Sequence, residues 1–246
     1  MTLLFLKLLL AHLVADFVIQ PLKWIKDKEQ KAFASTGLIL HAAVHAVLYA
    51  IAFSFNPDYW LGFAILVVSH YLIDGFKCMA GRYADNYSRP ESFINRRTFF
   101  VIDQLLHLVI IAFVVSLYFS GLSEWVIPQE KILALIIAVL LLTRVSSIII
   151  KVLISRWAPL NVYDGDHSLA NAGSFIGMLE RLFIFVFILS GNWHGIGFLL
   201  AAKSVFRFGD LKEAHDRKLT EYILIGTLIS FGLAIAVGLG YIGFIQ

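Results

Sequence analysis

This sequence has a single cysteine and few charged residues for its length. Cys78 is the only cysteine among 246 residues, which excludes an intramolecular disulfide and a metal site built from several thiolates. Asp, Glu, Lys and Arg together make up 15% of the chain, against about a quarter in a typical soluble domain. Apolar residues make up 59%, and apolar runs of about 20 residues recur along the whole chain. We therefore expect an all-helical integral membrane protein.

A basic stripe with interleaved aromatic residues is also missing, so the net charge of +3 does not indicate a nucleic-acid partner. The N-terminal run lacks the basic segment and the cleavage site of a signal peptide, and we expect it to be a retained span. The lipid bilayer is the partner that the composition implies, and the composition leaves the oligomeric state open.

Eight apolar runs are predicted to cross the membrane, at residues 2–20, 37–55, 60–79, 99–120, 130–154, 174–191, 194–207 and 220–244. The seventh run is short, and a re-entrant segment there would leave seven spans. Lysines and arginines lie in alternate connections, which predicts the cytoplasmic side and puts both termini outside the cytoplasm. The polar segments 21–36, 80–98 and 156–173 are expected loops. We expect two halves, residues 1–120 and 121–246.

Ionisable residues in the first four runs occur in pairs, four positions apart: His12 with Asp16, His41 with His45, His70 with Asp74, and Asp103 with His107. This spacing puts both members of a pair on one face of a helix. Their depths predict an inner layer of four histidines, with the other four residues one turn nearer the cytosol. Ionisable groups inside a membrane are rare and mostly functional, so the pattern indicates a site.

The same pairs predict an internal duplication. One offset separates His12 from His70 and Asp16 from Asp74, and a second shared offset relates the other two pairs. The first helical hairpin would thus be repeated as the second. Two such hairpins are related by an axis along the membrane normal, which would make the pairs converge.

Imidazole and carboxylate ligands suit zinc, iron or manganese, whereas copper(I) prefers sulfur. The eight candidates would supply one or two divalent ions, and zinc is favoured. The metal would activate a water, and Asp16 or Asp103 would accept its proton. Gln20 and Gln104 are expected to orient the ligands by hydrogen bonds. In the simpler interpretation, the pairs only form hydrogen bonds between helices.

A second group of charged residues lies in the later runs, at Arg144, Glu180, Arg181 and Lys203. Together with Lys77, near the cytoplasmic mouth, they are candidates for binding the headgroup of a substrate. The simpler interpretation is charge compensation between helices, with Glu180 paired to Arg144 or Lys203. Lys77 would then be an ordinary cation of the cytoplasmic side.

Four segments carry a resemblance to a known family: HLVADFVIQ, the HxxxH of the second run, SHYLIDGFK and DQLLH. Together they resemble the bacterial inner-membrane family catalogued as domain of unknown function 3307. IGMLERLFI, GFLLAAKSVFRF and EYILIGTLISF extend the resemblance into the second half. It implies a bacterial inner-membrane location and no established activity. The histidine and aspartate pattern is also similar to that of predicted membrane-bound metal-dependent hydrolases.

The leading hypothesis is a metal-dependent membrane hydrolase that acts on a lipid or amphiphilic substrate in the cytoplasmic half of the bilayer. One alternative is a transporter or channel for a divalent cation or protons, with the same residues as a transit site. Another is a membrane sensor or scaffold with a structural metal. A transporter needs a polar path on both sides, and the outer segments LLFLKLLL and VLYAIAFSF are almost purely apolar, which favours the enzyme.

Overall fold

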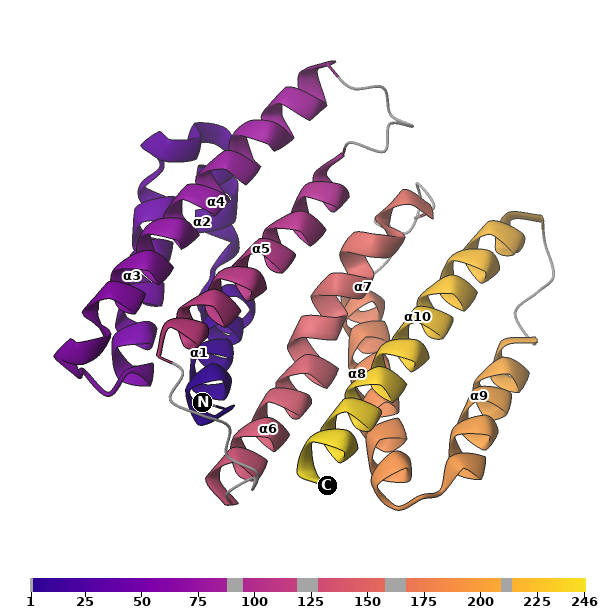
Figure 1. The fold of residues 1–246 in the computed structure, drawn as a ribbon. Coiled ribbons are helices and arrows are strands. Elements are labelled where there is room, and N and C mark those ends of the chain that lie inside the picture. Colours follow the sequence, from indigo (N-terminus) through magenta and orange to yellow (C-terminus); the bar gives the residue numbers. More distant parts are fainter. Residues whose placement is uncertain (1, 88–94, 119–127, 158–166, 209–213) are drawn as a thin grey trace. The chain divides into compact units, whose positions relative to one another are not determined.

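All regular secondary structure in the part of the chain that the structure describes is helical, which confirms the predicted class (Figure 1). The structure is a computed structural model, and it describes residues 2–87, 95–118, 128–157, 167–208 and 214–246. The chain forms two compact units, Met1–Leu133 and Ala134–Gln246. The boundary between the two units lies inside α6 (Pro128–Leu140). The sequence pattern predicts this boundary at residue 120.

Five helical stretches are long and apolar enough to cross a bilayer: Thr2–Ile19, Pro57–Asp85, Arg96–Leu117, Pro128–Trp157 and Thr220–Ile245. A sixth span results if α2 (Leu22–Lys31) and α3 (Thr36–Ala52) cross as one bent pair, with an angle of 102° between Leu22–Ala34 and Thr36–Ala52. The described residues thus give five or six candidate spans. Eight spans and the duplicated hairpin stay predictions.

Helix extends into all three segments that we expected to be loops. α2 lies inside 21–36, α4 (Trp60–Tyr87) continues past residue 79, and α8 (His167–Leu189) begins before residue 173. The low hydropathy of α2 is misleading because this helix packs against α3 and α4 with one face and presents polar residues on the other. The seventh predicted span corresponds to α9 (Trp193–Phe208), whose 16 residues are fewer than the roughly 20 needed to cross.

Four helices of unit 1 form a bundle around a buried centre (Figure 1). α1 (Thr2–Val14) packs against α3 and α5 (Arg96–Leu117), and α4 packs against the same two helices. The π-helix η1 (Ala15–Ile19) extends α1, and η3 (Pro57–Tyr59) leads into α4. Buried apolar side chains fill the end of the bundle at which α1 begins, among them Leu8, Tyr49, Leu66, Ile111 and Val114.

Asp27 holds the sharp bend between α2 and α3. Its Oδ2 accepts hydrogen bonds from Ser35 Oγ at 2.6 Å and from Gly37 N at 2.9 Å, and its Oδ1 lies 2.7 Å from Lys31 Nζ. Ser35 also caps α3, because its Oγ accepts a hydrogen bond from Leu38 N at 3.0 Å. These bonds satisfy backbone donors of the first turn of α3, so one helix can end and the next begin within a few residues.

Phe33, in η2 (Ala32–Ala34), holds α2 against α4. Its ring lies edge-to-face on Phe76, with centroids 5.3 Å apart, and its carbonyl accepts a hydrogen bond from the Tyr71 hydroxyl at 3.1 Å. The Phe33 ring fills the space beside Gly75, where any Cβ would clash with it. Glycine at position 75 therefore allows this close approach.

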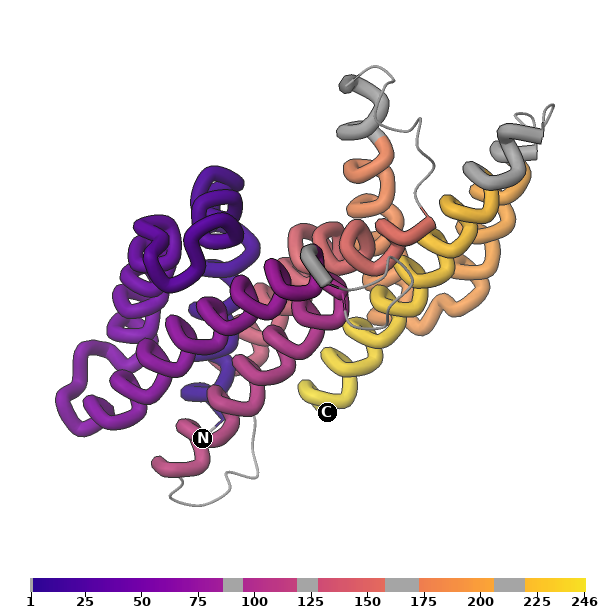
Figure 2. Tube along the Cα trace, turned by 90° about the horizontal axis from the view of Figure 1, so that it is seen from above, coloured from indigo at the N-terminus to yellow at the C-terminus, as the bar shows by residue number. Residues whose placement is uncertain are grey.

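Unit 2 is a second helical bundle. α10 (Ala214–Ile245) packs along α8 and α7 (Ser146–Ile154), and α9 packs against α8 (Figure 2). The π-helix η4 (Leu141–Val145) joins α6 to α7, and η5 (Ser155–Trp157) follows α7. Its core includes the buried side chains of Leu142, Ile184, Phe185, Ile188 and Ala234.

We expect Gly75→Ala to destabilise unit 1, because the added methyl group collides with the Phe33 ring and pushes α2 away from α4. The expected loss is about 1–3 kcal/mol, as for other overpacked sites, and it is measured as a lower Tm of the purified protein. Gly81→Ala is the matched control on the same helix, since a Cβ there meets only Arg96 Cγ, at 4.0 Å. Its Tm should be unchanged or higher. Equal Tm values for the two variants would contradict the packing role of Gly75.

Candidate metal centre

The eight residues of the four pairs come together in the centre of unit 1. Seven are buried, with at most 3% of the residue exposed: His12, His41, His45, His70, Asp74, Asp103 and His107. The eighth, Asp16, has a side chain that is 10% exposed. The four-residue spacing puts each pair on one helix face, and the packing of α1, α3, α4 and α5 turns these faces inward. We call this group the His/Asp cluster.

Four histidines form the inner part of the His/Asp cluster. The rings of His45 and His70 stack with centroids 3.5 Å apart. The centroid of the His107 ring lies 4.2 Å from that of His70 and 5.1 Å from that of His12. Each ring comes from a different helix, so the inner layer that the sequence predicts is present in the structure.

Asp16 lies at the centre of the outer part of the cluster. Its Oδ1 is 2.8 Å from His45 Nε2 and 3.2 Å from His41 Nε2. His41 Nε2 is in turn 3.2 Å from His70 Nε2 and 3.5 Å from Asp74 Oδ2. Nitrogen and oxygen atoms from three parts of the bundle therefore face one another at short range.

Two overlapping sets of ligand atoms could hold a metal ion, each within 4.8 Å: His12, Asp16, His45 and His70 in one, and His41, His70 and Asp74 in the other. A tetrahedral zinc ion with bonds of about 2.0–2.1 Å separates its ligand atoms by roughly 3.3 Å. The two separations from His41 Nε2, 3.2 and 3.5 Å, are close to this value, and the third, from His70 Nε2 to Asp74 Oδ2, is longer at 4.0 Å. The second set thus approaches the geometry of a zinc site, and it shares His70 with the first.

Several ring nitrogens in the cluster have no hydrogen-bond partner among the described residues. Both nitrogens of His12 and of His107 are buried and unpartnered. The Nδ1 atoms of His41, His45 and His70 are unpartnered as well. Buried polar atoms are normally hydrogen-bonded, so this concentration of exceptions agrees with residues that could hold a metal ion.

The π-helical turn η1 carries Asp16 and decides the position of Gln20. A π turn contains more residues than an α turn, so it rotates the following positions away from the stripe of His12 and Asp16. Gln20 has an extended backbone, and its buried amide nitrogen has no hydrogen-bond partner in the described part of the chain. The predicted role of Gln20 in orienting a ligand stays a prediction.

Gln104 does lie in the cluster, as expected. Its Nε2 donates hydrogen bonds to Asp16 Oδ2 at 2.9 Å and to Asp103 Oδ2 at 3.1 Å. It thereby connects the outer carboxylates of α5 and η1. Asp103 Oδ1, 3.8 Å from His107 Nδ1, is buried and has no hydrogen-bond partner among the described residues.

Two lysines neutralise the outer carboxylates. Lys28 Nζ lies 2.5 Å from Asp74 Oδ2, and Lys77 Nζ lies 2.7 Å from Asp74 Oδ1 and 2.8 Å from Asp103 Oδ2. Lys28 is only 4% exposed. Buried charges persist when they are paired and hydrogen-bonded in this way.

The sequence pattern does not single out Lys28. Its neighbours on α2, Lys23 and Lys26, are exposed, and nothing in the residue type distinguishes the three. The signal that was available is the amphipathic pattern of LKWIKDKEQK, which indicates that one face of this segment is covered. The sequence does not indicate the 102° bend between α2 and α3, and this bend brings the covered face of α2 to the His/Asp cluster.

The other residues predicted to bind a substrate, Arg144, Glu180, Arg181 and Lys203, belong to unit 2. Lys203 Nζ lies 2.6 Å from Glu180 Oε2, which confirms the predicted ion pair between these two. The Arg181 guanidinium donates hydrogen bonds to the Leu142 carbonyl, and Arg144 is exposed. The Glu180 and Lys203 pair is thus charge compensation between helices, whereas Arg181 bonds to neutral carbonyl and hydroxyl groups.

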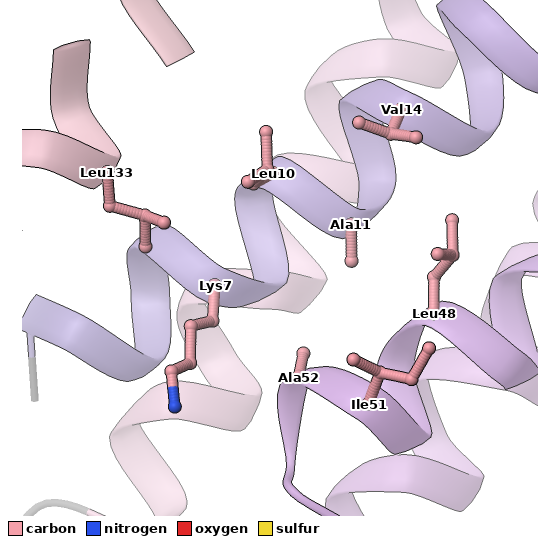
Figure 3. A pocket seen from close by; sticks show the side chains of 8 residues that line it. All are labelled: Lys7, Leu10, Ala11, Val14, Leu48, Ile51, Ala52 and Leu133. Atoms are coloured by element: carbon pink, nitrogen blue, oxygen red, sulfur yellow. The ribbon is translucent and has the colours of Figure 1, made fainter. Parts of the chain in front are cut away.

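An apolar pocket of about 260 Å³ also lies in unit 1, beside α1 and α3 (Figure 3). Of the side chains labelled there, Lys7 alone is charged, and the others are Leu10, Ala11, Val14, Leu48, Ile51, Ala52 and Leu133. None of the eight paired residues lines it. The pocket therefore offers apolar surface but no ligand for a metal.

Residues 4–135 match the family described as "Protein of unknown function (DUF3307)". The chain belongs to this family. The match covers nearly the residues of unit 1, which is the unit that contains the His/Asp cluster. The segments IGMLERLFI, GFLLAAKSVFRF and EYILIGTLISF lie outside it, so the DUF3307 resemblance is confirmed for the first half alone. Comparisons with curated proteins and with solved structures find no match.

We expect Lys28→Met to lower the stability of the metal-free DUF3307 protein, because buried Asp74 then keeps only Lys77 as a cationic partner. A loss of about 1–3 kcal/mol is typical for removing one charged hydrogen-bond partner, and the Tm reports it. Lys26→Met, at an exposed position of the same helix, should stay within about 0.5 kcal/mol of the wild type. A Lys28→Met protein as stable as Lys26→Met would show that the buried pair contributes nothing.

Proposed function

We propose that this DUF3307 protein is a metal-dependent membrane hydrolase whose divalent ion is held by the His/Asp cluster. The observation that carries the proposal is the set of buried, unpartnered imidazole nitrogens of His12 and His107 beside carboxylates. A buried polar atom without a partner costs about 1–3 kcal/mol. A divalent cation would accept one lone pair from each imidazole that it binds, which removes the cost for that nitrogen.

Zinc is the ion that the ligands suit best, with iron or manganese as alternatives. All ligand atoms in the two sets are nitrogen or oxygen, and the sets share His70 and draw on six residues: His12, Asp16, His41, His45, His70 and Asp74. One ion fits either set. Two ions bound at once would have to share these six residues. His107 and Asp103 lie nearby and would then supply further ligands.

A bound divalent ion supplies a water activated for attack on an ester. The cluster also offers an acceptor for the proton of that water, and we assign this role to Asp103. Its Oδ1 is buried and unpartnered, whereas its Oδ2 is held by Lys77 and Gln104. Asp16 is the weaker candidate, because its Oδ1 already faces His41 and His45.

Access to the cluster from one side supports an enzyme over a transporter. Four residues from each inner histidine, a buried apolar side chain closes the bundle: Leu8, Tyr49, Leu66 and Ile111. On the other side lie charged groups, and the Lys77 side chain is 22% exposed. A transporter or channel for a divalent cation or protons needs a polar path across both sides. A sensor or scaffold with a structural metal has no use for the unpartnered Asp103 Oδ1.

We further propose that the protein lies in a bacterial cytoplasmic membrane, with the open side of the cluster facing the cytosol and both termini outside. The support is the sequence bias of lysines and arginines toward one set of connections. The substrate would be a lipid or another amphiphile, because the cluster lies among candidate membrane spans. Of the residues predicted to bind it, Lys77 is the one that reaches the cluster.

The test is a vesicle assay with the purified full-length protein, zinc in the buffer, and amphiphilic fluorogenic phosphate and carboxyl esters as probes. The proposal predicts hydrolysis that a chelator abolishes and that falls at least about 100-fold in His12→Ala and in His70→Ala, as expected when metal ligands are lost. His194→Ala, at an exposed position of α9, should retain wild-type activity.

The same vesicles decide between the alternatives when a zinc indicator is trapped inside them. Zinc uptake that depends on His12 and His70, without ester hydrolysis, would contradict the enzyme and support the transporter. Bound zinc with neither uptake nor hydrolysis would support the structural metal.

A further inference from the structure

Lys28 and Lys77 place two ammonium groups at the outer edge of the His/Asp cluster. They reach it from different helices, α2 and α4, and they hold the two oxygens of the same carboxylate, Asp74. Lys77 also holds Asp103 and has a side chain that is 22% exposed, so this edge of the cluster is partly exposed. The lysines therefore stand between the outside and the candidate metal ligands.

The net charge of the His/Asp cluster changes sign when a divalent ion binds. Asp16, Asp74 and Asp103 bring three negative charges, and the two lysines bring two positive charges. With neutral histidines, the metal-free cluster has one negative charge. A single divalent ion turns this into one positive charge, and a second ion raises it further. A loaded cluster in an apolar bundle thus requires an anion nearby.

The lysines retain hydrogen-bonding capacity for such an anion. An ammonium group has three donors. Among the described residues, Lys28 Nζ donates to one oxygen of Asp74, and Lys77 Nζ donates to one oxygen each of Asp74 and Asp103. Two N–H groups of Lys28 and one of Lys77 are left for a ligand.

The fold fixes Lys28 in this position and excludes its neighbours from it. The Asp27 bonds set the bend after α2, and Phe33 beside Gly75 presses α2 onto α4. Lys23 and Lys26, on the same helix, remain exposed. The buried lysine is thus a built feature of the site, not one of several interchangeable surface cations.

We propose that Lys28 and Lys77 form a phosphate-binding subsite next to the metal ion, which makes a phosphate ester the substrate class of this protein. This inference rests on the proposed metal-dependent function. Phosphate oxygens suit both partners, because compact ammonium groups and hard divalent cations each bind them well. One phosphate oxygen would face the ion and the others would accept hydrogen bonds from the two lysines.

The test is calorimetric titration of the zinc-loaded, full-length protein with inorganic phosphate. Lys28→Met and Lys77→Met should each weaken phosphate binding roughly tenfold or more, the effect of losing one charged hydrogen bond. Lys26→Met is the matched control and should bind phosphate like the wild type. Lys28→Arg keeps the charge and should recover most of the affinity, which separates lost recognition from lost folding.

Zinc content, measured on each preparation, separates this inference from the proposed function. A wild-type protein that holds no zinc overturns both. A zinc-loaded wild type that does not bind phosphate, or that binds it no better than Lys28→Met and Lys77→Met, overturns the subsite and leaves the metal centre standing. If Lys28→Met fails to hold zinc, the phosphate affinities of Lys77→Met and Lys28→Arg are compared instead. Weaker binding by Lys77→Met than by Lys28→Arg supports the subsite, and equal binding overturns it.

A second arm distinguishes the source of the phosphate group. Nanodiscs of phosphatidylcholine, with or without phosphatidic acid, are added as competitors for inorganic phosphate. Competition by phosphatidic acid alone assigns the subsite to a lipid headgroup. Phosphate binding that neither nanodisc affects assigns it to a soluble phosphate ester, and both outcomes support recognition of the phosphoryl group.

Discussion

The burial of imidazoles and carboxylates between apolar helices is the constraint on which unit 1 depends. An ionised carboxylate removed from water persists only where cations or hydrogen-bond donors surround it. Two lysines satisfy Asp74 and Asp103, and histidines and Gln104 surround Asp16. The imidazoles of His12 and His107 are left without partners of their own among the described residues. A divalent cation held by His12, Asp16, His45 and His70 would give the His12 imidazole a partner.

The rest of unit 1 follows from keeping these groups in place. The π turn η1 sets Asp16 among four histidines. The bend fixed by Asp27, together with Phe33 beside Gly75, brings α2 close enough for Lys28 to reach Asp74. Unit 2 satisfies its charges separately, through the Glu180 and Lys203 pair and the hydrogen bonds of Arg181.

The sequence predicts the inner site well, because a spacing of four in an apolar helix leaves few alternatives. His12, His45, His70 and His107 meet as that spacing indicates. It does not predict the π turn that carries Asp16, because residue types do not indicate such a turn, and the role of Gln20 stays a prediction. It also fails at Lys28, whose place depends on a bend and on ring packing against Gly75 rather than on its own segment. Sequence periodicity therefore does not predict where a polar helix packs when its partners are distant in the sequence.

The most direct measurement of the central claim is zinc X-ray absorption spectroscopy on the purified full-length protein, with the metal content determined on the same sample. We expect about one or two zinc ions per chain, bound by nitrogen and oxygen at roughly 2.0–2.1 Å. We also expect the outer-shell scattering of imidazole, which should weaken in His70→Ala. A protein that retains no zinc, or one whose zinc shows sulfur ligands or no imidazole, would contradict the account.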